Sequence, residues 1–380
     1  MQNVWGDVIK VIECREDKQI LEVYVKMKYI KAIHYLYDQK KCTEGDRVLV
    51  NTSAIDLGLG TGGYGFVMAI YESHQESSSK SVPPGHIMKL RYTPVQVPVL
   101  SIESEDSHVH SLFSSSFSLE GKRVLLGELH SMLPIMASLI ETYQENRKIV
   151  YIMDDQASLH IAFSEHVHFL KEKLNLTTIT FGQAVGGDVE TINIYTALEA
   201  AYKLLQADDI IITHGPGVIG TGSQRGFSGM QLVHWLHAIH TCGGKGIIIP
   251  RIQFRDPRLR HKGLSHHMLE PLLKHSLASA QIPYPVRTLA GVEPNSNENI
   301  GKVEDIGSQD QGILEKQFSK LANKHAVAKI PIDSFKADIE QALNWYEHPI
   351  KTMGRGYEQE PYFFYAVGAA FKLYRSNVVE

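Results

Sequence analysis

The stretch Ile210-Ile-Ile-Thr-His-Gly-Pro-Gly-Val-Ile-Gly-Thr-Gly222 joins a short apolar run to a glycine-rich loop. The apolar run has the length of a buried strand, and an amphipathic segment follows at residues 230–241. The same alternation continues on both sides. Further strand-like runs occupy residues 123–126, 149–153, 177–181 and 246–250, and further amphipathic segments occupy residues 132–143, 157–174, 189–206 and 268–280. This alternation is typical of an α/β domain with a mainly parallel sheet and helices on both faces.

Residues 1–95 have a different pattern, which predicts a small antiparallel β-barrel. Short runs of β-branched and aromatic residues are separated by turn residues, at 7–12, 19–24, 47–51 and 65–70. Closing such strands into a barrel removes exposed edges. Five glycines within residues 58–65 predict either a tight hairpin or a contact surface. We therefore expect a barrel at 1–95, an α/β domain at 120–290, and a loop with C-terminal helices at 291–380 that packs on the α/β body.

The composition excludes several classes of protein. The chain has 380 residues, and its 38 Lys+Arg and 42 Asp+Glu give a net charge of −4. This balance gives no global reason to expect nucleic acid or an acidic membrane as a partner. The 3 cysteines have no paired spacing, which argues against a disulfide framework or a cysteine zinc site. Because no leader sequence and no apolar run of about 20 residues is visible, we expect a cytoplasmic protein.

Polar residues follow the predicted parallel strands at the point where each strand ends. Right-handed crossovers place all the carboxyl ends at one edge of the sheet, where open α/β sheets bind ligands. We therefore expect these residues to converge on one site. The candidates for proton transfer or catalysis there are His130, Asp154, Asp188, His214, His266 and His267. Asp155 and Asp188 are also suitable as N-caps of the helices that follow them.

The glycine-rich loop matches the pattern GxGxxG at Gly215, Gly217 and Gly220, and Gly222 follows. Such glycines let backbone N–H groups approach a phosphate, and a tight turn between strand and helix is the structural alternative. Two features argue against a dinucleotide site. Pro216 removes one N–H donor, and Arg251 occupies the region where an acidic residue is expected.

A cationic segment follows the last of these strands and indicates an anionic small molecule. Its predicted ligand-binding residues are Arg251, Arg255, Arg258 and Arg260, which surround a single acid, Asp256. The planar guanidinium group suits carboxylate and phosphate. A solvated basic loop with an Arg–Asp pair is the structural alternative. Nucleic acid is a less suitable partner, because few aromatic residues are interleaved.

His266 and His267 open a predicted helix after Ser265, which is a suitable N-cap. Adjacent residues do not share one helix face, so we expect their rings to point apart. Each could act as a general base, as a donor to a bound anion, or as a metal ligand together with Asp154, Asp155 or Asp188. The motif HExxH is absent. The sequence leaves the metal and any cofactor unknown.

Several motifs together resemble a family of uncharacterised bacterial proteins, a domain of unknown function with an N-terminal β domain and a C-terminal α/β domain. The motifs are Asp-Leu-Gly-Leu-Gly-Thr-Gly-Gly-Tyr-Gly at 56–65, Leu-His-Ser-Met-Leu-Pro at 129–134, Gly-Gly-Asp at 186–188, Gly-Pro-Gly-Val-Ile-Gly-Thr-Gly at 215–222 and Arg-Leu-Arg-His-Lys-Gly-Leu-Ser-His-His at 258–267. The resemblance covers most of the chain to about residue 290. It implies a bacterial origin and a two-part architecture, but no activity and no catalytic residue.

Three functions are compatible with these observations. The leading one is an enzyme or ligand-dependent protein that binds a small phosphate- or nucleotide-like anion at the carboxyl ends of the α/β strands. The first alternative is a non-enzymatic module whose barrel binds a partner or nucleic acid. The second is an NAD(P)-dependent oxidoreductase with Arg251 near a 2′-phosphate. The sequence does not indicate an oligomeric state.

Overall fold

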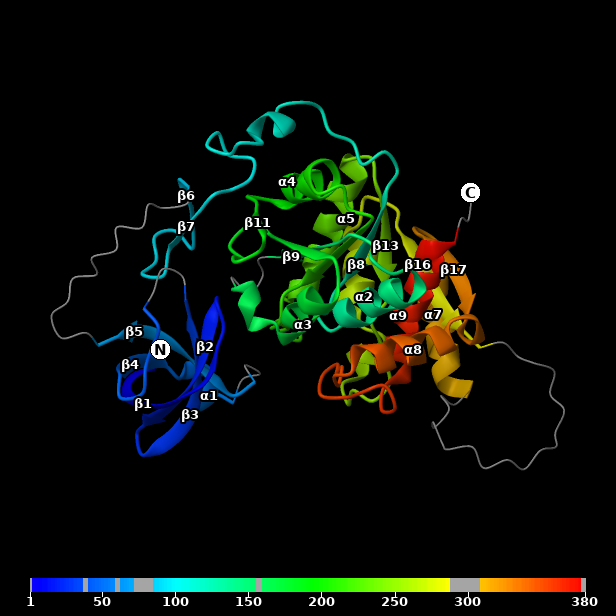
Figure 1. Cartoon of the computed structure of the whole chain (residues 1–380). Helices are drawn as coiled ribbons and strands as arrows, with labels where there is room; N and C mark the ends of the chain where they lie inside the picture. The colour runs from blue at the N-terminus through cyan, green and yellow to red at the C-terminus, as the bar shows by residue number, and fades with distance from the viewer. Residues whose placement is uncertain are drawn as a thin grey trace. The chain divides into compact units, whose positions relative to one another are not determined.

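The computed structural model describes residues 2–36, 40–58, 62–71, 85–154, 159–287 and 308–376. The chain divides into two compact units, Met1–Val99 and Leu100–Glu380 (Figure 1). Parts of two predicted loops, at residues 72–84 and 288–307, lie outside the described residues, as do Asp155 and residues 59–61 of the glycine-rich stretch near position 60. None of the helices within the described ranges is long and apolar enough to cross a membrane.

The first unit is a closed barrel with the strand order β1-β2-β3-β5-β4. Its strands are β1 (Asn3–Cys14), β2 (Lys18–Val25), β3 (Lys28–Tyr35), β4 (Arg47–Asn51) and β5 (Tyr64–Ile70), with α1 (Ser53–Asp56) between the last two. A short hairpin of β6 (Ile87–Lys89) and β7 (Val97–Val99) follows. The inward side chains form a separate small core that includes Val8, Leu21, Val23, Ala32, Val48 and Val50.

The predicted barrel is confirmed, with one difference in its strand pairing. Strands β3 and β5 run parallel, whereas the other neighbouring strands run antiparallel. A closed ring with an odd number of strands cannot alternate direction throughout, so one parallel pair is required. Strand β3 itself was not predicted, because its two lysines and its histidine interrupt the apolar alternation.

The second unit is built on an eight-stranded sheet with the order β11-β10-β9-β12-β8-β13-β16-β17, and every neighbouring pair is parallel. Its strands are β8 (Arg123–Gly127), β9 (Ile149–Asp154), β10 (Leu176–Thr180), β11 (Val189–Glu190), β12 (Asp209–His214), β13 (Lys245–Ile249), β16 (Gln281–Val286) and β17 (Ala326–Pro331). Every residue of β9 and β12 is buried, as expected for central strands covered on both faces.

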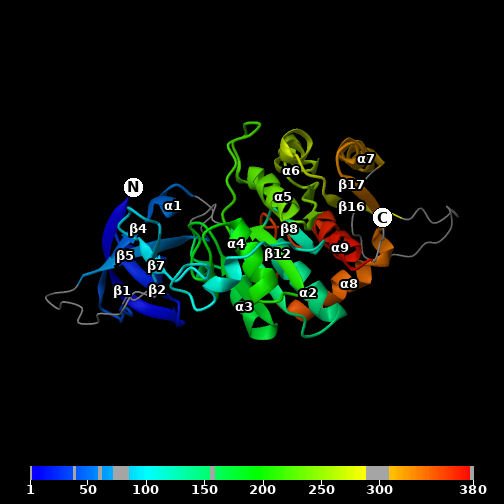
Figure 2. The same cartoon turned by 90° about the horizontal axis from the view of Figure 1, so that it is seen from above.

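Helices cover both faces of this sheet, as predicted (Figure 2). On one face lie α2 (Met132–Tyr143), α3 (Glu165–Lys173), α8 (Lys336–Tyr346) and α9 (Pro361–Arg375), where α2 packs against α3, α8 and α9. On the other lie α4 (Ile194–Glu199), α5 (Gln231–Thr241), α6 (His266–Glu270) and α7 (Ser308–Ala322). Right-handed crossovers produce this division, because the chain moves across the sheet first in one direction and then in the other.

Some predicted boundaries were wrong for identifiable reasons. The helix expected at 189–206 begins only at Ile194, because Asn193 caps it by accepting the N–H groups of Tyr195 and Thr196. Residues 189–190 form the short strand β11 instead. Strand β16 was missed because its sequence contains two prolines, which usually argue against a strand. Residues 308–312, expected as loop, already belong to α7.

Candidate functional site

The candidate site lies at the carboxyl ends of the central strands β12, β8 and β13. These strands are in register, with Thr213 and Ile249 on either side of Gly127. Strand β8 leads to α2 on one face of the sheet, whereas β12 and β13 lead to α5 and α6 on the other (Figure 2). Adjacent strands whose connections leave on opposite faces mark the position where open α/β sheets bind ligands. The residues that follow these three strands therefore meet at one edge.

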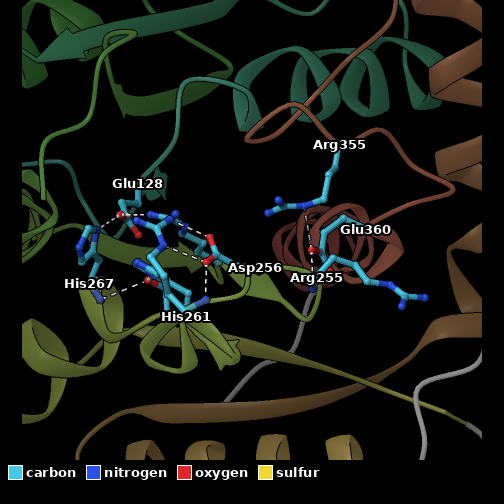
Figure 3. Close-up of polar contacts among 10 residues, drawn as sticks. Glu128, Arg255, Asp256, His261, His267, Arg355 and Glu360 are labelled. Carbon is cyan, nitrogen blue, oxygen red and sulfur yellow. Dashed lines mark hydrogen bonds and ion pairs between the residues drawn. The ribbon is translucent and has the colours of Figure 1, made fainter. Parts of the chain in front are cut away.

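A buried ion-pair network occupies this edge (Figure 3). Oε1 of Glu128 accepts hydrogen bonds from Nη1 of Arg251 at 2.7 Å and from Nδ1 of His267 at 3.0 Å. The Glu128 side chain is fully buried, and Arg251 is 2% exposed. Burial alone would raise the pKa of Glu128, but Arg251 and His267 together outweigh it and lower that pKa to about 2. Glu128 is therefore a fixed negative charge between a guanidinium and an imidazole.

Three imidazole rings, His261, His266 and His267, gather beside this network and are called the histidine cluster. His261 ends the short helix η5 (Leu259–His261), and the other two open α6. Their ring centroids lie 4.4 Å to 5.1 Å apart. The expectation that His266 and His267 point apart was wrong: their centroids lie 4.4 Å apart, and the turn through η5 brings His261 beside both rings. Ser265 caps α6 as predicted, accepting the N–H of His267.

Burial and nearby positive charges keep two of these rings neutral at pH 7. Burial is the largest cause that lowers the pKa of His261, to about 3, and Arg251 and Arg258 add to it. Burial also lowers the pKa of His266, followed by the charges of His267 and Arg260. A neutral imidazole presents a nitrogen lone pair, which can accept a proton or bind a metal.

The glycine loop, residues 215–222, lies against the histidine cluster. A Cβ atom added at Gly220 would lie 2.9 Å from Cε1 of His267, so only glycine permits this close approach. Gly217 and Gly222 have φ angles of +102° and +78°, which side chains rarely adopt. A Cβ at Gly222 would lie 3.8 Å from Nη1 of Arg260. The glycine loop and the cationic segment, predicted separately, are therefore side by side.

The four arginines predicted to bind a ligand have different surroundings. Arg251 is paired with Glu128, and Arg258 with Asp256, whose carboxylate lies 2.7 Å from Nη2. The NAD(P)-dependent oxidoreductase alternative needed Arg251 to contact a 2′-phosphate, but this arginine is already paired with Glu128. Arg260 is exposed, and no carboxylate among the described residues pairs with it.

Arg255 belongs to a segment that is held from the C-terminal part of the chain (Figure 3). Its backbone N–H and that of Phe254 donate to the carboxylate of Glu360, at 3.0 Å and 2.8 Å. Nε of Arg355 lies 3.3 Å from the same carboxylate. Glu360 directly precedes α9, so this helix fixes the chain that carries the predicted anion-binding residues. The side chain of Arg255 is exposed.

His130, Asp154 and His214 follow or end the strands β8, β9 and β12 and form a second buried group. Nδ1 of His214 lies 3.4 Å from Oδ2 of Asp154, and Trp235 packs on the His214 ring at 4.6 Å. His130 contacts the hydroxyl of Tyr151 at 3.1 Å. Burial is the largest cause that lowers the pKa of His130, to about 3. These three predicted residues are thus brought to the same edge of the sheet as the glycine loop that begins after His214.

Asp188 has a different environment from the other candidates. Its carboxylate pairs with Nζ of Lys171 at 2.5 Å and accepts hydrogen bonds from the backbone N–H and hydroxyl of Thr178 in β10. Burial would raise its pKa, but these partners outweigh it and lower the pKa. Asp188 therefore stabilises the turn between β10 and β11. Its role in ligand chemistry stays a prediction.

Sequence reasoning did not select Glu128 and His261 as site residues. Glu128 had one available signal, because an acid that directly follows an apolar strand in a parallel sheet must be paired or exposed. The register places it beside the residues after β13, where Arg251 is the nearest cation in sequence. His261 had no such signal, because its position depends on the turn through η5.

Comparisons with known proteins add a family but no activity. No curated protein matches the chain. One solved structure, described as "The crystal structure of YloQ, a circularly permuted GTPase", is 8% identical, with a TM-score of 0.13. The match covers 65% of this chain and spans 59% of that one, and a superposition this poor carries no argument.

The family match extends further than the sequence analysis expected. The resemblance was expected to end near residue 290, but the family model covers residues 31–371 and so includes the C-terminal helices. This agrees with the contact between Glu360 and the segment around Arg255. With most of its length matched, the chain belongs to the family described as "Protein of unknown function (DUF3866)".

Proposed function

We propose that this protein binds a small anionic ligand, of phosphate or nucleotide type, at the carboxyl edge of its parallel sheet, as an enzyme or as a ligand-dependent protein. One observation carries the proposal: the guanidinium of Arg260 lies against Gly222 of the glycine loop and has no acidic partner among the described residues. Arg251 and Arg258 are already neutralised by Glu128 and Asp256. Arg260 therefore remains available to neutralise an anion.

The chemistry of the two segments is complementary to a phosphate group. A guanidinium can donate two parallel hydrogen bonds to phosphate oxygens. The glycines of the loop have no side chains to keep an anion away from backbone N–H groups. His266, whose pKa is lowered by burial first and then by His267 and Arg260, is the candidate to exchange a proton with a ligand held there.

Replacing Arg260 by glutamine is expected to weaken anion binding. Charge-assisted hydrogen bonds contribute about 1.5–3 kcal/mol, so the dissociation constant should rise by roughly 10- to 100-fold. The measurement is the melting temperature of the native protein and of the variant with phosphate, pyrophosphate and a panel of nucleotides. A ligand at about 100 times its dissociation constant stabilises the folded state by about 2.7 kcal/mol.

Lys320→Gln is the matched control for this experiment. Lys320 is exposed in the last turn of α7, and α7 leads to the amino end of β17. The variant therefore also removes one positive charge, but on the side of the opposite edge of the sheet. It should keep the full response to the anion. The proposal is overturned if no anion stabilises the native protein, or if Arg260→Gln responds as strongly as Lys320→Gln.

The barrel alternative keeps one supporting observation of its own. Outward-facing residues form a row across four strands, because Asp7 pairs with Arg47 and with Tyr24, and Tyr24 pairs with Tyr29. Tyr29 is 65% exposed, and aromatic rings can stack with bases. A native protein that no anion stabilises would favour this module over the α/β edge.

A further inference from the structure

The histidine cluster brings ring nitrogens together closely enough to hold a metal ion. Within the described part of the chain, a single group of three or more potential ligand residues has its atoms within 4.8 Å of one another, namely His261, His266 and His267. Zinc–nitrogen bonds of about 2.0–2.1 Å place tetrahedral ligand nitrogens about 3.3 Å apart. The rings therefore need to approach one another by about an ångström and a half at most.

The hydrogen bonds of two rings leave the same nitrogen available. Nδ1 of His267 faces Oε1 of Glu128, which accepts only, so Nδ1 carries the proton. Nδ1 of His261 lies 2.8 Å from Oγ of Ser265. Metal-binding histidines are usually held in this way, with the second nitrogen fixed by a carboxylate or another polar group. Nε2 of each ring is left for an ion.

His261 gives an independent reason to expect a ligand. The residue is 1% exposed, and its Nε2 has no hydrogen-bond partner. A buried polar atom without a partner costs about 1–3 kcal/mol, which a bound ion would relieve. Both ring nitrogens of His266, which is half-buried, also have no side-chain hydrogen-bond partner.

We propose that His261, His266 and His267 form a binding site for a divalent transition metal, with Glu128 and Ser265 orienting two of the three rings. Three imidazoles without a thiolate suit Zn²⁺, and sites of this composition keep a fourth position for water or substrate. Glu128 and Asp256 supply negative charge beside the ion, whereas Arg251 and Arg258 offset it. An anionic fourth ligand would therefore strengthen the site, but the three histidines define it without one.

The test is titration of the full-length protein, stripped with a chelator, with Zn²⁺ and Co²⁺ in a buffer without phosphate. Calorimetry gives the stoichiometry, and the visible spectrum of Co²⁺ reports tetrahedral coordination by nitrogen. We expect one equivalent to bind. His266→Gln removes a ligand that has no side-chain hydrogen-bond partner, so the variant should fold normally. It should bind the metal at least ~100-fold more weakly, since even outer partners contribute 10- to 100-fold.

His240→Gln is the matched control, because His240 is an exposed histidine at the end of α5. It should bind the metal as the native protein does. The proposal is overturned if the native protein binds neither ion, if His266→Gln binds as tightly as the native protein, or if both variants lose affinity equally. Because no phosphate is present, this result is independent of anion binding, which is measured in turn with the chelator present.

Discussion

Replacing Glu128 by alanine is expected to lower the free energy of unfolding by about 3–5 kcal/mol, because it leaves a buried guanidinium without its counter-charge. Arg251 is 2% exposed, so its positive charge is removed from water. Its Nε atom has no hydrogen bond, and the ion pair with Glu128 offsets the cost of burying this charge. Urea denaturation of the native protein and the variant at pH 7 measures the change. A loss of this size would show that the Glu128–Arg251 ion pair is needed for the stability of the folded α/β unit.

The double variant Glu128→Leu/Arg251→Met separates the cost of the unpaired charge from the value of the pair. Replacing both partners by apolar groups of similar size is often nearly neutral, so it should recover most of the lost stability. Glu172→Ala, which removes an exposed partner of His168, should change stability by less than about 1 kcal/mol. A loss below 1 kcal/mol for Glu128→Ala would contradict the buried network.

Acidification from pH 7 to pH 5 is expected to destabilise the α/β unit, because a buried neutral histidine opposes protonation. Burial lowers the pKa of His130 from its ordinary 6.5 to about 3. The unfolded chain therefore takes up a proton on this residue below about pH 6.5, and the folded chain does not until about pH 3. Stability is full above this window and falls as the pH decreases through it, by about 1.4 kcal/mol per pH unit for each such group.

His130→Gln should remove one such contribution while keeping a polar group beside Tyr151 and Ser164. The dependence of unfolding free energy on pH between 6.5 and 5 should become shallower by roughly 1 kcal/mol per unit, because the unfolded histidine is only half protonated at pH 6.5. The same substitution at the exposed His240 should leave the dependence as in the native protein. Equal slopes for the native protein and His130→Gln would show that His130 is not buried in its neutral form.

Most of the fold was predictable because the signals for it are local. Strands β8, β9, β12 and β13 are short apolar runs between turn residues, and burial on both faces makes them easy to recognise. Strands β3, β16 and β17 lack such runs. Strand β3 is held by its hairpin with β2, whereas β16 and β17 are held by pairing with segments farther away in sequence, such as Gln281 of β16 with Ile247 of β13.

The site was predictable only in its location. Parallel topology alone places His130, Asp154 and His214 at one edge. Which charges are neutralised was not predictable, because the partner of Arg251 lies 123 positions away. The convergence of the histidine cluster depends on the turn before α6, for which the sequence carries no periodic signal.

Anomalous diffraction from crystals soaked in tungstate, a heavy analogue of phosphate, would locate an anion at the carboxyl edge of the parallel sheet. We expect a tungstate peak in contact with the Arg260 guanidinium and the backbone of the glycine loop, and the loss of that peak in Arg260→Gln crystals. Peaks confined to the barrel or to the amino edge of the sheet, with none beside Arg260, would contradict it.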